Sequence, residues 1–243
     1  MRFFALALFA GLTACSFSWG DDDKGGPGVV GVGGGTQRTY PVTGFSGVDL
    51  RGADDVDVRV GTAYSVRAEG PAKELDSLRI MQDGDTLQIG RRHTTGIGWG
   101  HHDKVRIFVT LPRLAVAGVA GSGTMAIDRV EGAKFVGELA GSGDLKLAAM
   151  NVDAAEFSIA GSGDVSAAGT ARSLDVDIAG SGNLDAPGLH AQRADVDVAG
   201  SGDVRALVAG PAKVDIMGSG DVDLGPQAKC TVSKMGSGSA RCR

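Results

Sequence analysis

The chain has 243 residues, enough for one or two domains, and its 42% apolar content allows a sizeable core. Aromatic residues make up only 5%, so that core must be aliphatic, whereas the 40 glycines far exceed the usual share of about 7%. The formal net charge of −5, with acids and bases spread along the sequence, excludes the concentrated basic face of a nucleic-acid binder.

Residues 1–14 are typical of a signal peptide. Their apolar stretch is too short to span a bilayer, which requires about 20 apolar residues. The tetrapeptide LTAC at 12–15 resembles the bacterial lipobox, which predicts cleavage before Cys15 and lipidation of that cysteine. Several acyl chains anchor a protein firmly, since each buried methylene contributes about 0.8 kcal/mol. The alternative is an ordinary signal peptide cut after Ala14, which leaves Cys15 an incidental thiol.

Residues 15–36 are rich in glycine and aspartate and show no periodicity, which predicts a flexible tether behind the lipid. Their G-x-G-x-x-G pattern lacks the flanking strand and helix of a dinucleotide site, so no cofactor is predicted. Ser16 follows the cysteine, and a serine there is typical of bacterial lipoproteins sorted to the outer membrane. The sequence therefore predicts a bacterial cell-envelope protein, lipid-anchored in the outer membrane and either periplasmic or surface-exposed.

One domain is expected over 37–243, and its first part, 37–112, is the less regular. The stretch VDLRGADDVDV at 48–58 alternates apolar and polar residues on both sides of a glycine, which predicts two strands around a corner. Further strands are expected at 62–70, 85–92 and 104–110.

The segment HTTGIGWGHHD at 93–103 is expected to project as a loop. His93, His101, His102 and Asp103 are candidate ligands for a transition metal. Adjacent histidines on a strand would point to opposite faces, however, and no cysteine supports such a site. A solvated loop is therefore favoured, and no metal is predicted.

The second part, 113–243, repeats one turn. Variants of the heptapeptide IAGSGDV recur seven times, and the first glycine of each Gly-Ser-Gly follows the previous one by 18–20 residues. This period predicts a solenoid. Apolar and polar residues alternate on both sides of each turn, which indicates two half-buried strands per unit and an all-β parallel β-helix. The first glycines of the corners are Gly121, Gly141, Gly161, Gly180, Gly200, Gly218 and Gly236.

Each corner is expected to stack on its neighbour, about 4.8 Å away. Glycine adopts positive φ at no steric cost and allows backbones to approach closely. The third residue after the first glycine is usually Asp or Asn, which can hydrogen-bond the nearby backbone and hold the turn. Calcium bound between coils is the alternative, but one carboxylate per coil supplies too few oxygens for a site that takes 6–8. These corner residues are Asp144, Asp164, Asn183, Asp203 and Asp221.

Four short motifs accompany the corners: FSGVDL at 45–50, ADDVDV at 53–58, DGDTLQI at 83–89 and VTLPRL at 109–114. Together they resemble the putative auto-transporter adhesin head GIN domain family, over about 37–243. The resemblance implies a right-handed, single-stranded parallel β-helix with an adhesive or structural role. It implies no established activity, so no catalytic residue is carried over.

Cys230 and Cys242 remain once Cys15 is lipidated, and an even pair in a secreted chain predicts a disulfide. The bond would close around the last Gly-Ser-Gly, where the open end of a solenoid needs a cap. Two free buried thiols are the alternative.

No catalytic motif is present. The corner serines do not form G-x-S-x-G, and H-E-x-x-H and a P-loop are absent. The sequence predicts a non-enzymatic adhesin or surface-binding β-helix, held at a membrane by its lipid, whose ligand is a glycan or a protein rather than nucleic acid. The alternatives are a structural or envelope-stress lipoprotein without an external ligand, and a carbohydrate-active β-helix enzyme, although only two Trp and two Tyr are available as sugar platforms.

Overall fold

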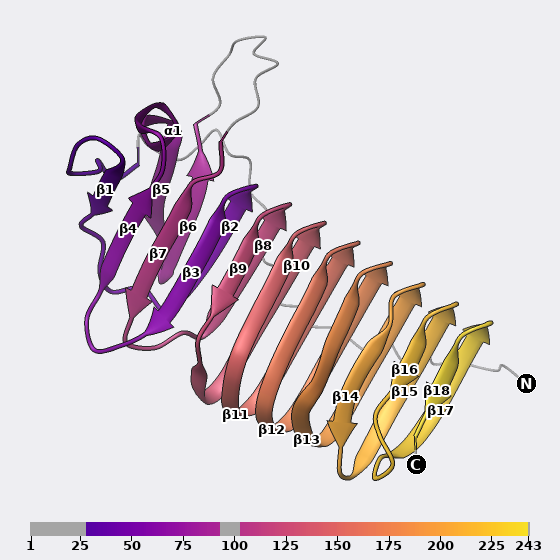
Figure 1. Ribbon diagram of the computed structural model, residues 1–243. Coiled ribbons are helices and arrows are strands. Elements are labelled where there is room, and N and C mark those ends of the chain that lie inside the picture. Colours follow the sequence, from indigo (N-terminus) through magenta and orange to yellow (C-terminus); the bar gives the residue numbers. More distant parts are fainter. Residues whose placement is uncertain (1–27, 93–102, 243) are drawn as a thin grey trace, which may run out of the picture.

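The computed structural model describes residues 28–92 and 103–242. Within them, 18 strands belong to one sheet that winds into a solenoid, with its coils stacked along a single axis (Figure 1). The rest of the chain lies outside the described residues, and this includes Cys15 and the histidines of the loop at 93–102. In the described part, no helix is long and apolar enough to cross a membrane.

The repeated part of the sequence forms the regular coils, and the prediction of a parallel β-helix is confirmed. The register places corner on corner, so that Gly141 lies opposite Gly161, which lies opposite Gly180. In the middle coils the pairing continues around the bends, and the strands there are longer than the two short ones that the sequence predicts. The strands are β8 (Val116–Gly121), β9 (Thr124–Ile127), β10 (Val130–Gly141), β11 (Asp144–Gly161), β12 (Asp164–Gly180), β13 (Asn183–Gly200), β14 (Val204–Val208), β15 (Pro211–Gly218), β16 (Asp221–Asp223), β17 (Lys229–Gly236) and β18 (Ser239–Arg241).

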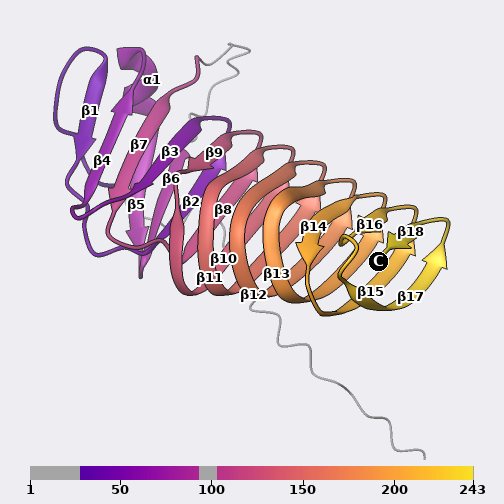
Figure 2. The ribbon, with the colours of Figure 1, turned by 60° about the horizontal axis from the view of Figure 1, so that its bottom comes forward.

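Two coils precede the repeats, and their order along the axis differs from their order in the chain. Gly52 is the corner of the first coil and lies opposite Gly121. The second coil pairs with the other edge of the first, so the first coil of the chain lies second in the stack (Figure 2). All four strands fall where the sequence predicts strands. They are β2 (Gly47–Gly52) and β3 (Asp55–Val60) in the first coil, and β6 (Thr86–Arg91) and β7 (Arg106–Leu111) in the second.

Antiparallel strands cover the start of the solenoid, which corrects the prediction of irregular coils throughout 37–112. Strand β4 runs antiparallel to β7, β1 to β4, and β5 to β6. Alternating apolar and polar residues identify a strand but do not distinguish a parallel partner from an antiparallel one. A solenoid end exposes unpaired backbone groups, and these strands occupy that edge. The elements of this cap are β1 (Gln37–Tyr40), β4 (Ser65–Glu69), the short helix α1 (Ala72–Ser77) and β5 (Leu78–Asp83).

The last residues assigned to the tether, 28–36, pack against this cap. The Val29 amide donates a hydrogen bond to the Ile80 carbonyl at 2.7 Å, and Val32 exchanges two backbone hydrogen bonds of 2.8 Å with Thr39. Backbone pairing of this kind needs no side-chain period, which is why the composition of this segment does not reveal it. The folded unit therefore begins before residue 37.

The core is aliphatic, as the composition predicts. The positions two residues before the corners, such as Val119, Leu139 and Ile159, are buried in every coil except the last, where Lys234 is exposed. Aromatic packing inside the repeats is confined to one pair among the described residues, Phe135 and Phe157, whose ring centroids lie 6.1 Å apart.

The other end of the solenoid is the last coil, formed by β17 and β18. A disulfide joins Cys230 and Cys242, with the two Cα atoms 6.0 Å apart, and both residues pack against the core. The bond ties β17 to the residue that follows β18. It therefore fastens the coil that has no further coil to pair with.

Removing this bond is expected to loosen the last coil. The chain-entropy model assigns about 3 kcal/mol to a loop of this length. We expect Cys242→Ser to lower the stability of the terminal coil and to speed amide exchange in β17 more than in β12. Mass spectrometry of unreduced, alkylated wild-type protein checks the premise, because alkyl label on both cysteines without reduction would show that packing alone holds the coil.

Candidate functional site: an acidic face on the solenoid

The corners that the sequence singles out are structural, and glycine is required in them for two separate reasons. The first glycine of each Gly-Ser-Gly has positive φ, for example +124° at Gly161. The second is buried and has no room for a side chain, since a Cβ on Gly163 would lie 2.2 Å from the Gly143 carbonyl oxygen.

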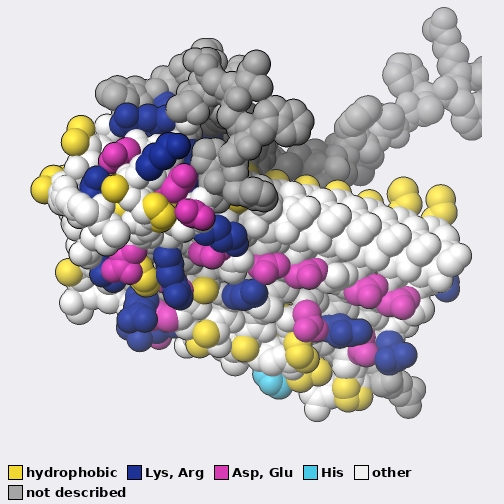
Figure 3. Space-filling model, turned by 45° about the horizontal axis from the view of Figure 1, so that its top comes forward, with side chains coloured by type: hydrophobic (Ala, Val, Ile, Leu, Met, Phe, Trp, Pro, Cys, Tyr) yellow, Lys and Arg dark blue, Asp and Glu magenta, His cyan; other side chains and the backbone are white. Residues whose placement is uncertain are grey.

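The Asp and Asn residues of the corners bond from one coil to the next. The Asn183 amide donates to Asp164 at 2.8 Å, and the backbone N–H of Asp203 donates to the Asn183 side-chain oxygen at 2.8 Å. The backbone N–H of Asp221 donates to the Asp203 carboxylate at 2.9 Å. Figure 3 shows the acidic row beside basic side chains. These contacts agree with a turn-stabilising role for the acidic row.

Calcium between the coils finds no support in this geometry. Among the described residues, no three His, Cys, Asp or Glu side chains come together in a way that could hold a metal ion. On the outer surface next to the corner row, Lys146 pairs with Asp144 at 3.0 Å and Arg241 pairs with Asp223 at 3.1 Å. Ion pairs therefore neutralise part of the negative charge on this surface.

A different surface carries more carboxylates and fewer basic partners. It is the outer side of the strand segments that run into the corners, in β10 to β13, β15 and β17, and we call it the acidic face. Successive coils place outward side chains in columns, because the strands are parallel and in register. The carboxylates of this face are Glu138, Glu156, Asp175, Asp177, Asp195, Asp197 and Asp215.

Few lysine or arginine side chains pair with these carboxylates. Within the described residues, Lys134 pairs with Glu156 at 2.6 Å, and Lys213 lies 3.5 Å from Asp195 and 2.5 Å from Asp215. None of the described lysines or arginines lies within 4.0 Å of Asp175, Asp177 or Asp197 (no ion pair of these three is present). The coils that carry Asp175, Asp177 and Asp197 therefore keep a net negative charge on this face.

The crowding of carboxylates changes their protonation. Burial against the sheet raises the pKa of Asp175, and the neighbouring Asp177 and Asp195 raise it further. Burial also raises the pKa of Asp177, with Glu156 and Asp195 adding to the effect. The pKa of Asp197 is raised in the same way, although Lys213 partly opposes the shift. Each group is therefore less stable as an anion here than in water, and a bound cation would relieve that cost.

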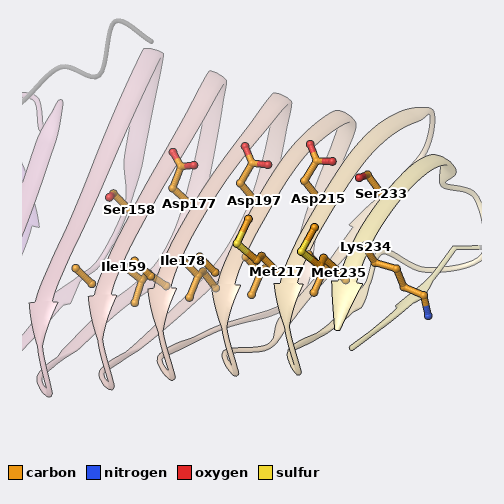
Figure 4. Close-up of a pocket in the computed structure, with 15 residues that line it drawn as sticks. Ser158, Ile159, Asp177, Ile178, Asp197, Asp215, Met217, Ser233, Lys234 and Met235 are labelled. Carbon is orange, nitrogen blue, oxygen red and sulfur yellow. The ribbon is translucent and has the colours of Figure 1, made fainter. Parts of the chain in front are cut away.

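An apolar column runs beside the acidic one, at the residue directly before each corner. It consists of alanines in the middle coils and of methionines at the end, where Met217 is 63% and Met235 72% exposed. Between the two columns lies a shallow groove of about 520 Å³ (Figure 4). The figure shows the Asp177, Asp197 and Asp215 carboxylates in line and pointing the same way. The alanines of the groove are Ala160, Ala179 and Ala199.

The sequence carries a signal for this groove that the alternation of strands conceals. The segments DVDI, DVDV and VDI stand before three successive corners, and their alternation alone indicates only strands. Stacking turns the outward residues of such segments into columns, so a residue type that recurs at one position of a repeat forms a stripe on the surface.

Repulsion on the acidic face predicts that Asp177→Asn stabilises the protein at neutral pH. A raised folded-state pKa means that the native state holds its proton more tightly than the unfolded chain, so stability falls as pH rises above about 4, the unfolded value. We expect Asp177→Asn to gain a few tenths of a kcal/mol at pH 7, a small effect because the group is largely exposed, and to match wild type at pH 3.5. Urea unfolding at both values measures the difference.

Asp221→Asn serves as the control of opposite sign. Hydrogen bonds from Ser239, through its hydroxyl at 2.7 Å and its amide at 2.9 Å, lower the pKa of Asp221. Its stabilisation is present above the unfolded pKa and is lost as pH falls through the folded value. This variant should therefore be less stable than wild type at pH 7. If both variants changed the free energy of unfolding in the same direction, the opposite pKa shifts of Asp177 and Asp221 would be contradicted.

The fold is a β-solenoid scaffold that carries an acidic groove along one face. The family model described as putative auto-transporter adhesin, head GIN domain matches residues 44–241, and the chain belongs to this family. The resemblance drawn from the sequence is therefore confirmed. No curated protein matches the sequence.

Solved structures share the fold at low sequence identity. A putative adhesin from Bacteroides fragilis is 20% identical with a TM-score of 0.76, over 85% of this chain and 96% of that one. A protein from Parabacteroides distasonis described as a putative lipid binding protein is 22% identical with a TM-score of 0.72, over 88% and 98%. A putative adhesin from Parabacteroides merdae is 15% identical with a TM-score of 0.66, over 86% and 95%.

Proposed function

We propose that the protein is a non-enzymatic, lipid-anchored component of the bacterial cell envelope that binds a cationic surface ligand through its acidic face. The observation that carries this proposal is the groove between a column of carboxylates and a column of exposed alanines and methionines. Exposed methionines and carboxylates with raised pKa both cost the free protein stability, which favours a surface kept for binding.

The family description supports an adhesive role over an enzymatic one. The acidic face also lacks what a polysaccharide-cleaving β-helix needs. Besides three carboxylates and Lys234, the groove is lined by small and aliphatic side chains, and no aromatic residue lines it on which a sugar ring could stack. We therefore place the carbohydrate-active alternative behind the binding role.

The anchor is tested at Cys15. We expect Cys15→Ser to release the protein into the aqueous phase or to leave an uncleaved precursor, because the lipidated cysteine supplies the membrane attachment. Detergent phase partitioning of cell extracts measures it. Partitioning of the variant like that of wild type would contradict lipidation.

Binding is tested on an array that carries neutral, anionic and amine-bearing glycans together with basic peptides. We expect the chain, produced without its lipid, to be retained on the cationic members. Retention should fall when both Asp177 and Asp197 are replaced by Asn. A chain that is retained on no member would favour the structural role without an external ligand.

Charge alone is controlled with a second double variant. Asp153 and Asp185 are exposed and lie away from the acidic face, and Asp153→Asn with Asp185→Asn changes the net charge by the same amount. This variant should be retained like wild type. Equal losses for the two double variants would show a non-specific effect of net charge rather than a site.

A further inference from the structure

The acidic column has a fixed and short repeat. Asp177, Asp197 and Asp215 occupy the same position in three successive coils, paired in register. Parallel strands of a sheet lie about 4.8 Å apart, so the carboxylates follow one another at about that spacing. In Figure 4 they form a straight line along the solenoid axis, between Ser158 and Ser233.

The apolar column keeps the same repeat. Ala160, Ala179 and Ala199 lie in register with one another and with Met217 and Met235. In the three coils of Asp177, Asp197 and Asp215, a ligand that lies along the groove therefore meets one carboxylate and one apolar side chain per coil. The occupant that suits both columns is a chain in which positive charges alternate with short apolar links.

We propose that the groove binds a linear polyamine whose ammonium groups are separated by three methylenes, laid along the solenoid axis with its charges at Asp177, Asp197 and Asp215. The inference rests on the proposed function and names its ligand class. Standard bond lengths place nitrogens three methylenes apart at roughly 5 Å, close to the repeat of the coils. The methylenes between them cover the alanine and methionine side chains, and removing that surface from water adds to the affinity.

Other cations match the groove less well. An extended basic peptide presents side chains of one face only every 6.4–6.8 Å or so, and drifts out of register with the coils. A divalent metal such as calcium takes 6–8 oxygens, and no group of three candidate ligands is present among the described residues. The Lys213 ammonium lies 2.5 Å from Asp215 and 3.5 Å from Asp195, so the end of the column already accepts an ammonium group. A ligand ammonium at Asp215 shares that carboxylate with Lys213.

Isothermal titration calorimetry at low salt tests the proposal, because screening weakens exposed charge pairs. The probe is bis(3-aminopropyl)amine, and the matched control is bis(6-aminohexyl)amine, which has the same charge but longer links. We expect saturable binding of the first probe, at least tenfold tighter than that of the second. Equal affinities, or no saturable binding of the first probe, would overturn the proposal.

The two double variants locate the site. Asp177→Asn with Asp197→Asn should weaken binding of bis(3-aminopropyl)amine at least tenfold, whereas Asp153→Asn with Asp185→Asn should change it less than twofold. Equal weakening would overturn the site. A chain that ignores the polyamine but loses array retention in the first double variant would overturn the ligand class and leave the proposed function standing.

Discussion

Gly161→Val is expected to destabilise the solenoid by about 3 kcal/mol or more, the sum of two effects of similar size. The residue has a φ of +124°, which costs a branched side chain about 1–3 kcal/mol. A Cβ there would also lie 2.4 Å from the Gly141 carbonyl oxygen, so the stacked backbones must move apart. Thermal unfolding followed by circular dichroism measures the loss, which corresponds to roughly 6–12 °C for a chain of this size.

Neighbouring positions of the same corner separate these effects. Gly163→Ala should also destabilise the protein, although its φ is not positive, because a Cβ there would meet the Gly143 carbonyl oxygen at 2.2 Å. Ser162 lies between them and is exposed, so Ser162→Ala should stay within about 0.5 kcal/mol of wild type. A Gly161→Val variant that melts like Ser162→Ala would show that the corner backbone is not constrained as described.

Arg91→Ala is expected to cost about 3–5 kcal/mol, because it leaves buried carboxylates without their counter-charge. Arg91 donates two hydrogen bonds to Asp54, at 2.8 and 2.6 Å, and a third to Glu74. The Asp54 side chain is only 3% exposed and also accepts the Val105 amide at 3.0 Å. The cluster joins the cap to the first coil. Urea unfolding of the variant and of wild type measures the loss in free energy of unfolding.

An exposed ion pair provides the contrast. Arg241 pairs with Asp223 at 3.1 Å, but its side chain is 79% exposed, so Arg241→Ala should cost no more than about 1 kcal/mol. Arg91→Ala combined with Asp54→Asn removes both charges at the same loss of packing, and should recover part of the loss seen in Arg91→Ala. A double variant no more stable than the single one would show that the guanidinium acts by packing rather than by charge.

The repeats could be read from the sequence because every coil obeys the same local rules. Gly161 and its counterparts recur at a fixed period, and the alternation around them assigns inside and outside at once. The Arg91–Asp54–Glu74 cluster has no such signature, since its three members are 17 to 37 residues apart and meet only through the stacking of the second coil on the first. The antiparallel pairing in the cap is also not predictable from the local sequence, because the direction of a strand relative to its neighbour depends on distant partners.

The candidate site lies between these two cases. Asp177, Asp197 and Asp215 could be found from the sequence once the coil period was known, since they hold one position of the repeat. Their role as part of a groove depends on the side chains that lie beside them in the folded protein. The alanines and Met217 lie two residues after this position in the chain, yet only the stacked geometry shows that they line one groove with the carboxylates.

The claim that this groove is the functional surface is tested most directly by carboxylate footprinting. The chain is labelled with a water-soluble carbodiimide and an amine nucleophile, with and without the array component that retains it best, and modified peptides are quantified by mass spectrometry. We predict protection of Asp175, Asp177 and Asp197, with unchanged labelling of Asp144, Asp185 and Asp223 beyond the corners. Protection of the second set, with the acidic face labelled as in the free protein, would contradict the account.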